Sequence, residues 1–246
     1  LDIVVERLPT GISHDIAGVE LFIRTIIDAT ADYAAAYKPN LAFFLALGVE
    51  GYALLSQLRQ IIPPNVLLVG DAKWGDIGNT ASMYAEVAFH KLHFDAVTVN
   101  PYQGSDAIEP FLTDPKHGAF VLCRTSNASS PELQGQGKNA LFTTVARMAD
   151  RWNSNNNCGL VVGASDPEEL GVVHALAPSL PLLIPGIGAQ GGDLKTCMEQ
   201  LHCWSQSGLL VNSSRSILYG DNGPNYPKHA GGATAELNDS IRRHLA

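Results

Sequence analysis

Short apolar runs that alternate with helical patterns are the feature that most constrains the fold of this chain. Seven runs have the length and composition of buried strands, and stretches of helical periodicity separate them. This alternation is typical of βαβ units around a parallel sheet. The expected strands are Ala34–Pro39, Val66–Lys73, Ala96–Pro101, Ala119–Ser126, Gly159–Ala164, Leu182–Ile187 and Leu209–Ser213. The expected helices are Gly18–Ala31, Leu41–Ile61, Thr80–Leu92, Leu141–Trp152, Pro167–Leu176, Asp193–Leu201 and Ala235–Leu245.

Eight βα units in about 250 residues are the size of a (β/α)8 or TIM barrel. We interpret Leu1-Asp2 as the tail of a first strand whose body precedes this numbering, and predict one α/β TIM-barrel domain over residues 1–246 with that strand largely missing. A doubly wound sheet is the alternative, but it usually carries an early G-x-G-x-x-G turn, which is not present. The loops Ser126–Asn139 and Tyr219–Gly232 are long enough to act as lids.

Composition and charge argue against several classes of partner. The net charge is −8 without a basic cluster, so we expect no nucleic-acid partner. No apolar run approaches the ~20 residues that span a bilayer, and no signal peptide is visible, so we expect no membrane partner. The four cysteines show no C-x-x-C spacing, which favours reduced thiols. We therefore expect a cytoplasmic protein.

The stretch Asp71-Ala72-Lys73-Trp74-Gly75-Asp76 directly follows a run that reads as a buried strand. Residues two apart on a strand face the same way, so Asp71 and Lys73 should project together, and Asp76 in the loop beyond can reach the same ammonium. A lysine between two carboxylates stays protonated, which disfavours imine chemistry. It favours a proton donor, or a positive charge beside a forming carbanion. The alternative is a surface salt bridge.

Other polar residues also follow the expected strands, where the βα loops of a TIM barrel form the active site. Asp2, Lys38, Asp71 and Lys73 give a line of alternating charge across consecutive strands. Ion pairs in such positions are expensive to desolvate, which favours a functional explanation. Further polar residues at strand ends are Asn40, Asn100, Gln103, Arg124, Thr125, Ser126 and Asn127.

The last two strands carry a pattern typical of phosphate binding. Pro185–Asp193 is a glycine-rich loop that opens a helix, where backbone N–H groups and the helix N-terminus attract an anion. The next strand ends in Asn212-Ser213-Ser214-Arg215, and TIM barrels often hold phosphate between these two loops. The alternative is a tight turn beside a surface arginine. The residues thus predict a small phosphorylated substrate in the mouth of a barrel.

Several motifs together resemble one enzyme family over essentially the whole chain. Asp71-Ala72-Lys73-x-x-Asp76-Ile77-x-Asn79-Thr80 matches the signature of the orotidine 5′-monophosphate decarboxylases. Tyr37–Asn40, Val97–Pro101, Pro185–Gly192 and Val211–Arg215 resemble a bacterial-type branch. The resemblance implies decarboxylation of orotidine 5′-monophosphate to UMP, the last step of de novo pyrimidine biosynthesis, without metal or organic cofactor. It also implies either a free enzyme or a domain of a bifunctional UMP synthase.

The resemblance also implies roles for individual residues. Lys73 would protonate C6 of the pyrimidine, Asp71 would lie near the departing carboxylate, and Lys38 would hold this array and contact the ribose. Thr125 and Ser126 would read the base. The other residues implied in substrate binding are Asp2 and Asn40 at the ribose or the charged array, Gln190 and Arg215 at the phosphate, and Ile77, Pro185 and Gly188.

A shared active site is a further implication of the same resemblance. Asp76 and Thr80 would reach across the interface of a homodimer into the partner's site, and Asn127–Gly137 would form part of a lid. Trp74 stands where a smaller or basic residue is expected, and its side chain should point away from the site. Two alternatives stay open: a metal-dependent sugar-phosphate decarboxylase or aldolase of the same superfamily, which shares D-x-K-x-x-D, and a non-catalytic nucleotide-binding barrel.

Overall fold

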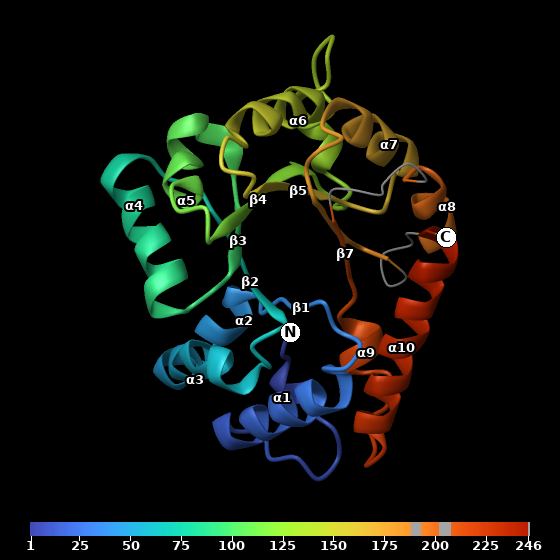
Figure 1. Ribbon diagram of the computed structural model, residues 1–246. Helices are drawn as coiled ribbons and strands as arrows, with labels where there is room; N and C mark the ends of the chain where they lie inside the picture. Colours follow the sequence, from blue (N-terminus) through green and yellow to red (C-terminus); the bar gives the residue numbers. More distant parts are fainter. Residues whose placement is uncertain (188–192, 202–207, 246) are drawn as a thin grey trace.

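The computed structural model describes residues 1–187, 193–201 and 208–245. Within this part of the chain, seven parallel strands pair in chain order and curve into a nearly closed barrel (Figure 1). The strands are β1 (Ala36–Tyr37), β2 (Leu67–Trp74), β3 (Ala96–Val99), β4 (Gly118–Arg124), β5 (Cys158–Val162), β6 (Leu182–Pro185) and β7 (Leu209–Asn212). The predicted α/β barrel is confirmed.

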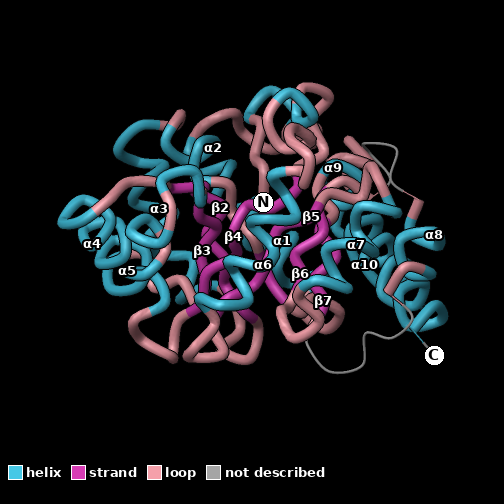
Figure 2. The backbone as a smooth tube through the Cα atoms, turned by 90° about the horizontal axis from the view of Figure 1, so that it is seen from above, coloured by secondary structure: helices cyan, strands magenta, loops and turns pink. Residues whose placement is uncertain are grey.

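Helices surround the strands on the outside, as Figures 1 and 2 show from two directions. They are α1 (Ile16–Thr30), α2 (Leu41–Leu45), α3 (Gly48–Ile61), α4 (Gly78–Glu86), α5 (Glu109–Leu112), α6 (Leu141–Trp152), α7 (Pro167–Leu176), α8 (Leu194–Glu199), α9 (Arg215–Leu218) and α10 (Tyr226–Leu245). Shorter turns are η1 (Val5–Arg7), η2 (Val87–Lys91), η3 (Pro101–Gln103), η4 (Ser105–Ala107) and η5 (Ser130–Glu132). None of the described helices is both long and apolar enough to cross a membrane.

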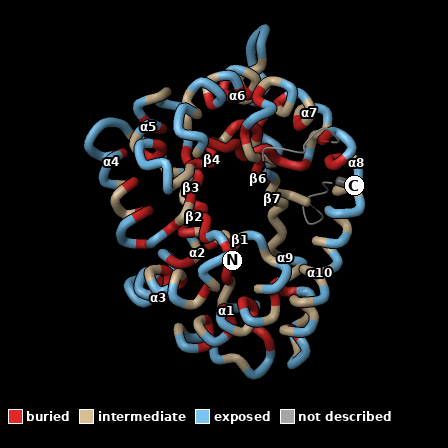
Figure 3. The backbone as a smooth tube through the Cα atoms, in the orientation of Figure 1, coloured by how far each residue is buried: buried red, intermediate tan, exposed pale blue. Residues whose placement is uncertain are grey.

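Two apolar layers hold the barrel together, because alternate side chains of each strand point to opposite faces. The larger layer lies between the strands and the helices, and buried backbone follows it around the ring in Figure 3. The smaller layer fills the barrel interior with one residue from each of five neighbouring strands. These interior residues are Val69, Ala96, Phe120, Val161 and Leu183, all at most 8% exposed.

The expected first strand is not part of the observed sheet. Leu1 and Asp2 lie outside the seven strands, and no pairing of the described residues joins β7 to β1. The backbone of Leu1 nevertheless runs beside β1: its amino group donates to the Lys38 carbonyl at 2.6 Å, and Asn40 N–H donates to the Leu1 carbonyl at 3.3 Å. Asp2 is thereby held beside the carboxyl ends of the strands.

Two predicted elements were wrong, and glycines explain both. The expected helix Leu41–Ile61 is two helices, because Gly48 has φ +71° and turns the chain between α2 and α3. The expected loop Tyr219–Gly232 is helical from Tyr226 onward. Gly231 lets α10 approach α1 closely, since a Cβ there would lie 2.8 Å from the Ala29 carbonyl oxygen.

Candidate active site

A cavity of about 540 Å³ opens at the carboxyl ends of the strands, where TIM barrels place their active sites. The interior residues Val161 and Leu183 lie at its floor, together with Leu122. Its walls are polar and come from segments that are far apart in the sequence. The polar side chains are Asp2, Lys38, Asn40, Asp71, Lys73, Thr98, Thr125, Ser126, Asn127, Gln134, Asn212, Ser213, Ser214 and Arg215.

Asp71 is the centre of a chain of charges in this cavity. Lys38 Nζ donates to Asp71 Oδ2 at 2.5 Å, and Lys73 Nζ donates to Asp71 Oδ1. The Asp71 N–H donates to the Pro39 carbonyl at 2.9 Å, which holds this part of β2 beside the segment that follows β1. Asp71 and Lys73 both contribute to this chain, so the predicted line is formed from Lys38 through Asp71 to Lys73. Its fourth predicted member, Asp2, lines the cavity but forms no ion pair within the described residues.

The charge of Asp71 is maintained by its two partners. Burial alone would raise its pKa, but attraction by Lys38 and Lys73 and their hydrogen bonds outweigh burial and lower the pKa from 3.8 to about 2. Asp71 is 8% exposed, whereas the Lys73 side chain is 46% exposed. The site therefore presents a partly exposed ammonium group that a buried carboxylate holds in place.

Asp76 does not contact Lys73, contrary to the expectation that the lysine lies between two carboxylates. In the part of the chain that the structure describes, Asp76 forms no ion pair, and its Oδ1 accepts from the Ile77 N–H at 2.8 Å. The physical reason is local: Lys73 has φ +54°, so the backbone changes direction before Asp76. Asp76, Ile77 and Thr80 all lie outside the cavity wall, and Ile77 and Thr80 are exposed.

The segment after β4 forms the part of the cavity wall to which the family resemblance assigns base recognition. Thr125 and Ser126 both line the cavity. Gln134 clamps Thr125, since its Oε1 accepts from the Thr125 N–H and its Nε2 donates to the Thr125 hydroxyl, both at 2.8 Å. Arg124, which is 8% exposed, donates to Glu169, to Ser130 and to the Thr125 carbonyl, so a buried arginine anchors the start of this loop.

The phosphate side of the cavity is only partly described. Pro185 and Arg215 line it, and Arg215 is the exposed first residue of α9. Among the described residues, two buried oxygens of the cavity lining, Asp2 Oδ1 and Ser214 Oγ, have no hydrogen-bond partner. Buried polar atoms normally have partners, so these two oxygens are available to a ligand. The predicted residues Gly188 and Gln190 lie outside the described residues.

Asn40 and Trp74 both take the positions that strand geometry predicts. Asn40 lines the cavity and caps α2, its side chain accepting from the Ala42 N–H at 3.1 Å. The Trp74 ring stacks on Tyr84 of α4, with 4.9 Å between ring centroids, so it points away from the cavity into the helix layer. Its bulk therefore does not narrow the space around Lys73.

Sequence reasoning missed Thr98 and Gln134 among the polar residues of the site. Thr98 is 1% exposed and contacts both Asp71 and Lys73, but a threonine inside an apolar strand is an ordinary strand residue by composition. Gln134 lies nine residues beyond Thr125, in a loop without periodicity. Thr98 stands in the motif Val97–Pro101 and Gln134 in the segment Asn127–Gly137, but their roles could not be read from the sequence, because both act through contacts between separate segments.

Comparisons with known proteins agree with this geometry. A family model described as "Orotidine 5'-phosphate decarboxylase / HUMPS family" matches residues 12–223. A protein named orotidine 5'-phosphate decarboxylase from Thermomicrobium roseum is 47% identical over 248 residues, which cover 99% of this chain and 88% of that protein. A protein of the same name from Roseiflexus sp. is 45% identical over 245 residues, which cover 97% of this chain and 89% of that protein.

Solved structures show the same similarity in three dimensions. OMP decarboxylase of Leishmania donovani has a TM-score of 0.85 at 40% identity, covering 94% of this chain and 89% of that one. UMP synthase of Leishmania donovani has a TM-score of 0.87 at 40% identity, covering 98% of this chain and 54% of that longer one. The fold and the charged cavity define a TIM-barrel enzyme. More narrowly, the chain belongs to the orotidine 5'-phosphate decarboxylase / HUMPS family.

Proposed function

We propose that this protein decarboxylates orotidine 5′-monophosphate to UMP, the last step of de novo pyrimidine biosynthesis. The observation that carries the proposal is the Lys73 ammonium, held by buried Asp71 at the wall of a cavity large enough for a nucleotide. The relatives that are 45–47% identical over almost the whole chain are named for this activity. The reaction needs no metal or organic cofactor in this proposal.

The charged chain suits a reaction that passes through a carbanion. The bond between C6 and the carboxylate breaks, carbon dioxide leaves, and the electron pair stays on C6. Lys73 then donates a proton to C6, and the amine regains a proton from solvent. Because negative charge on C6 grows along the reaction, the ammonium binds the transition state more tightly than the substrate. Asp71 holds the ammonium and lies near the departing carboxylate.

In this proposal, different parts of the cavity wall bind the ribose, the pyrimidine and the phosphate. Asp2, Lys38 and Asn40 contact the ribose, and Thr125 and Ser126 read the pyrimidine edge. Arg215 binds the phosphate as a charge-assisted fork. From the family resemblance, Gln190 would share the phosphate and Pro185 and Gly188 would also bind the substrate; Gly188 and Gln190 lie outside the described residues. Binding energy from the phosphate, far from C6, is then available to orient the reacting ring.

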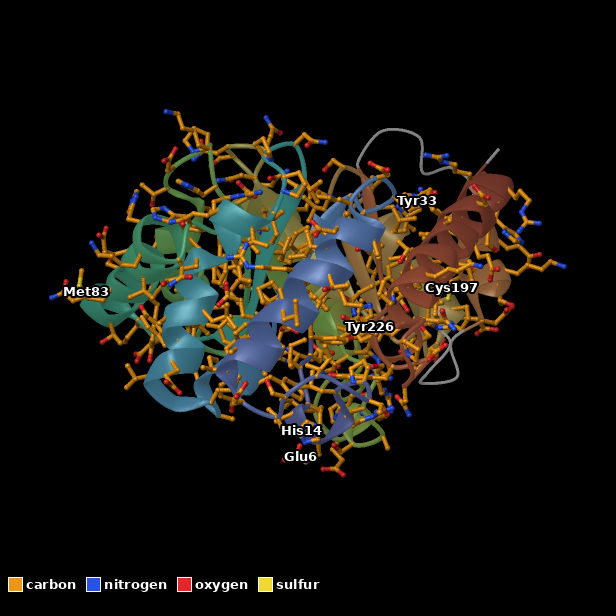
Figure 4. All side chains as sticks on the ribbon, turned by 90° about the horizontal axis from the view of Figure 1, so that it is seen from below. Glu6, His14, Tyr33, Met83, Cys197 and Tyr226 are labelled. Atoms are coloured by element: carbon orange, nitrogen blue, oxygen red, sulfur yellow. The ribbon has the colours of Figure 1, made fainter. Side chains whose placement is uncertain are left out.

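We also propose a homodimer in which Asp76, Ile77 and Thr80 complete the partner's site. All three lie at or within the start of α4 and outside the cavity of their own chain, and Ile77 and Thr80 are exposed, which supports this arrangement. Large apolar side chains are exposed on the same side: Ile77 is 48% exposed, Met83 60% and Tyr102 75%. Met83 points outward from α4 in Figure 4. A partner subunit would cover such side chains.

For the compartment we propose the cytoplasm. Three cysteines, Cys123, Cys158 and Cys197, are free and buried. Burial raises the pKa of the Cys123 and Cys158 thiols to about 12 and that of Cys197 to about 11, so all three stay protonated and unreactive at neutral pH. Free thiols of this kind are usual in reducing compartments.

The direct test is the loss of orotidine 5′-monophosphate absorbance on adding purified protein, with UMP identified as the product. Activity should persist in EDTA. A rate that EDTA abolishes and a divalent metal restores, with a sugar phosphate as substrate, would instead favour the metal-dependent relatives. Tight UMP binding without any turnover would favour a non-catalytic barrel. Among the described residues no group of three His, Cys, Asp or Glu side chains is placed to hold a metal ion.

A further inference from the structure

Lys73 has an unusual backbone conformation for a residue inside a strand. Its φ is +54°, a left-handed conformation that side chains other than glycine rarely adopt. The pairing of β2 with β3 shifts at the same place: Gly70 is opposite Val97, and Trp74 is opposite Val99. Four steps along β2 therefore match two along β3. Such irregularities re-aim side chains near active sites.

Thr98 is the residue of β3 that faces this irregularity. It lies between Val97 and Val99, and it is 1% exposed. The Lys73 N–H donates at 3.0 Å to Thr98 Oγ1, a side-chain acceptor on the neighbouring strand. The Thr98 hydroxyl in turn donates to Asp71 Oδ1 at 3.2 Å. One buried hydroxyl thus binds the backbone of the lysine and the carboxylate that holds the lysine's side chain.

This double contact links the direction of the Lys73 side chain to the orientation of the Asp71 carboxylate, and the reaction needs both. The left-handed turn sets the direction in which the Lys73 side chain leaves the strand. The bond to Oδ1 sets the orientation of the carboxylate, whose same oxygen accepts from Lys73 Nζ. Without the hydroxyl, the part-buried Lys73 N–H would lose this partner, and the backbone would be free to relax from the left-handed region.

We propose that Thr98 is a positioning residue that aims the Lys73 ammonium at the reacting carbon. Thr98 acts through Lys73 and Asp71, and its hydroxyl, not its methyl group, is the part that the reaction requires. This inference rests on the proposed function, since it assigns Lys73 the role of proton donor. It predicts that the hydroxyl at position 98, and not the volume there, controls the rate of the chemical step.

Two matched pairs of side chains at position 98, Thr with Val and Ser with Ala, separate the effect of the hydroxyl on the rate from the effect of side-chain volume. Thr98→Val replaces the hydroxyl of threonine with a methyl group of similar size, and Val is favourable in a buried strand. Thr98→Ala and Thr98→Ser differ from each other only by the hydroxyl, so they provide the same comparison if Thr98→Val does not fold. We expect kcat to fall about 10²-fold in Thr98→Val and Thr98→Ala, the loss typical of a small misplacement of a reacting group.

Thr98→Ser should restore most of that loss, although it removes a buried methyl group. The KM for the nucleotide and the affinity for UMP should change little in any variant, because the other walls of the cavity make those contacts. A merely structural role would give a different order, with Ser and Ala equally impaired and the loss following stability. Wild-type kcat in Thr98→Val, equal loss in Ser and Ala, or an effect on KM alone would each overturn the inference.

A second measurement does not depend on the substrate. Amide hydrogen exchange at Lys73 should be slow in wild type and Thr98→Ser, and faster in Thr98→Val and Thr98→Ala. If the wild type does not decarboxylate orotidine 5′-monophosphate, the proposed function fails, whereas this exchange pattern still tests the link between Thr98 and Lys73. If the wild type is active but all four proteins exchange alike at Lys73, the positioning role of Thr98 is wrong.

Discussion

Asp71 carries its charge in a place that carboxylates rarely occupy, 8% exposed and in contact with two ammonium groups. Desolvating the Asp71 carboxylate and the Lys38 ammonium, whose side chains are 8% and 11% exposed, is costly, and the attraction between them offsets that cost only when the geometry is good. A barrel does not need such a cluster for stability, since apolar residues of similar volume would serve as well. The cluster is better explained by the ammonium that it holds at the cavity wall.

The first prediction concerns Lys73. Lys73→Ala should lower kcat by at least the ~10²–10⁴-fold typical of a general acid. Binding of UMP should be largely retained, because the ribose, base and phosphate contacts come from other residues. Steady-state kinetics and UMP titration measure the two quantities separately. A variant with near-wild-type kcat would show that Lys73 is not the proton donor.

The second prediction uses the lowered pKa of Asp71. A carboxylate whose pKa is lower in the folded than in the unfolded protein stabilises the fold at pH values above its unfolded pKa, here 3.8. That contribution is lost as the pH falls from 3.8 towards about 2. The free energy of unfolding of wild type should therefore decline more steeply across this window than that of Asp71→Asn. Parallel curves for the two proteins would contradict the lowered pKa.

The third prediction concerns Arg215. Arg215→Ala should weaken binding of UMP by roughly 1.5–3 kcal/mol, the worth of a charge-assisted contact, and leave uridine binding almost unchanged. Lys195→Ala is a control for net charge, because Lys195 lies on α8 outside the cavity wall and its side chain is 67% exposed. Isothermal titration with UMP and with uridine separates the contribution of the phosphate to binding from that of the nucleoside. Equal weakening for UMP and uridine would mean that Arg215 does not contact phosphate.

At the scale of elements, strand periodicity correctly predicted that Asp71 and Lys73 line one cavity, although Lys73 reaches it from a left-handed backbone position and not from a regular strand. The ends of neighbouring strands supplied Lys38, Thr125 and Arg215. Periodicity failed where the backbone leaves its regular path. The left-handed turn at Lys73 moves Asp76 away from the ammonium, and no composition signal marks that turn.

The predicted bounds of α6 and α7 match the structure, but the break between α2 and α3 at Gly48 was missed. The pattern from Leu41 to Ile61 is continuous in its apolar spacing, and the corner at Gly48 depends on packing. Gly51 shows why: a Cβ there would lie 2.0 Å from the Phe44 carbonyl oxygen, so α3 can pack this closely on α2 only with glycine. Conversely, Gly231 indicated a loop but lies inside α10, where it provides close contact with α1.

The opposite end of the barrel gives a prediction about stability. Arg59, near the end of α3, donates to the carbonyls of Ile62, Pro63 and Val66 and pairs with Asp95 at 3.1 Å. Arg59→Leu should reduce the free energy of unfolding by about 1.5–3 kcal/mol, because those acceptors lose a charged donor. Its kcat at temperatures where it stays folded should be unchanged, since this face of a TIM barrel serves stability.

A matched control for Arg59 is Arg24, which pairs at 2.8 Å with Glu20 on the exposed side of α1. Exposed ion pairs one helical turn apart contribute little, so Arg24→Leu should change stability by less than about 1 kcal/mol. Denaturant unfolding of both variants beside the wild type measures the difference. Similar losses of unfolding free energy in the two variants would show that the Arg59 contacts stabilise the fold no more than an exposed ion pair does.

At the scale of the whole molecule, the position of Asp76 is the feature that a single chain does not explain. It stands in the signature that includes Lys73, yet in its own chain it lies outside the cavity wall. A two-fold axis beside α4 would bring the same loop of a partner towards this cavity, because such an interface places identical surfaces opposite each other. Lys73→Ala and Asp76→Ala homodimers should then each be inactive.

Mixing these two inactive proteins tests the shared site. In a mixed dimer, one site carries both lesions and the other carries neither, so random exchange should restore about a quarter of the wild-type activity. Subunit exchange is verified by pull-down of differently tagged protomers, and each variant incubated alone provides the baseline. If Asp76 served its own chain, each site of the mixed dimer would still lack one residue, and no activity would return despite complete exchange.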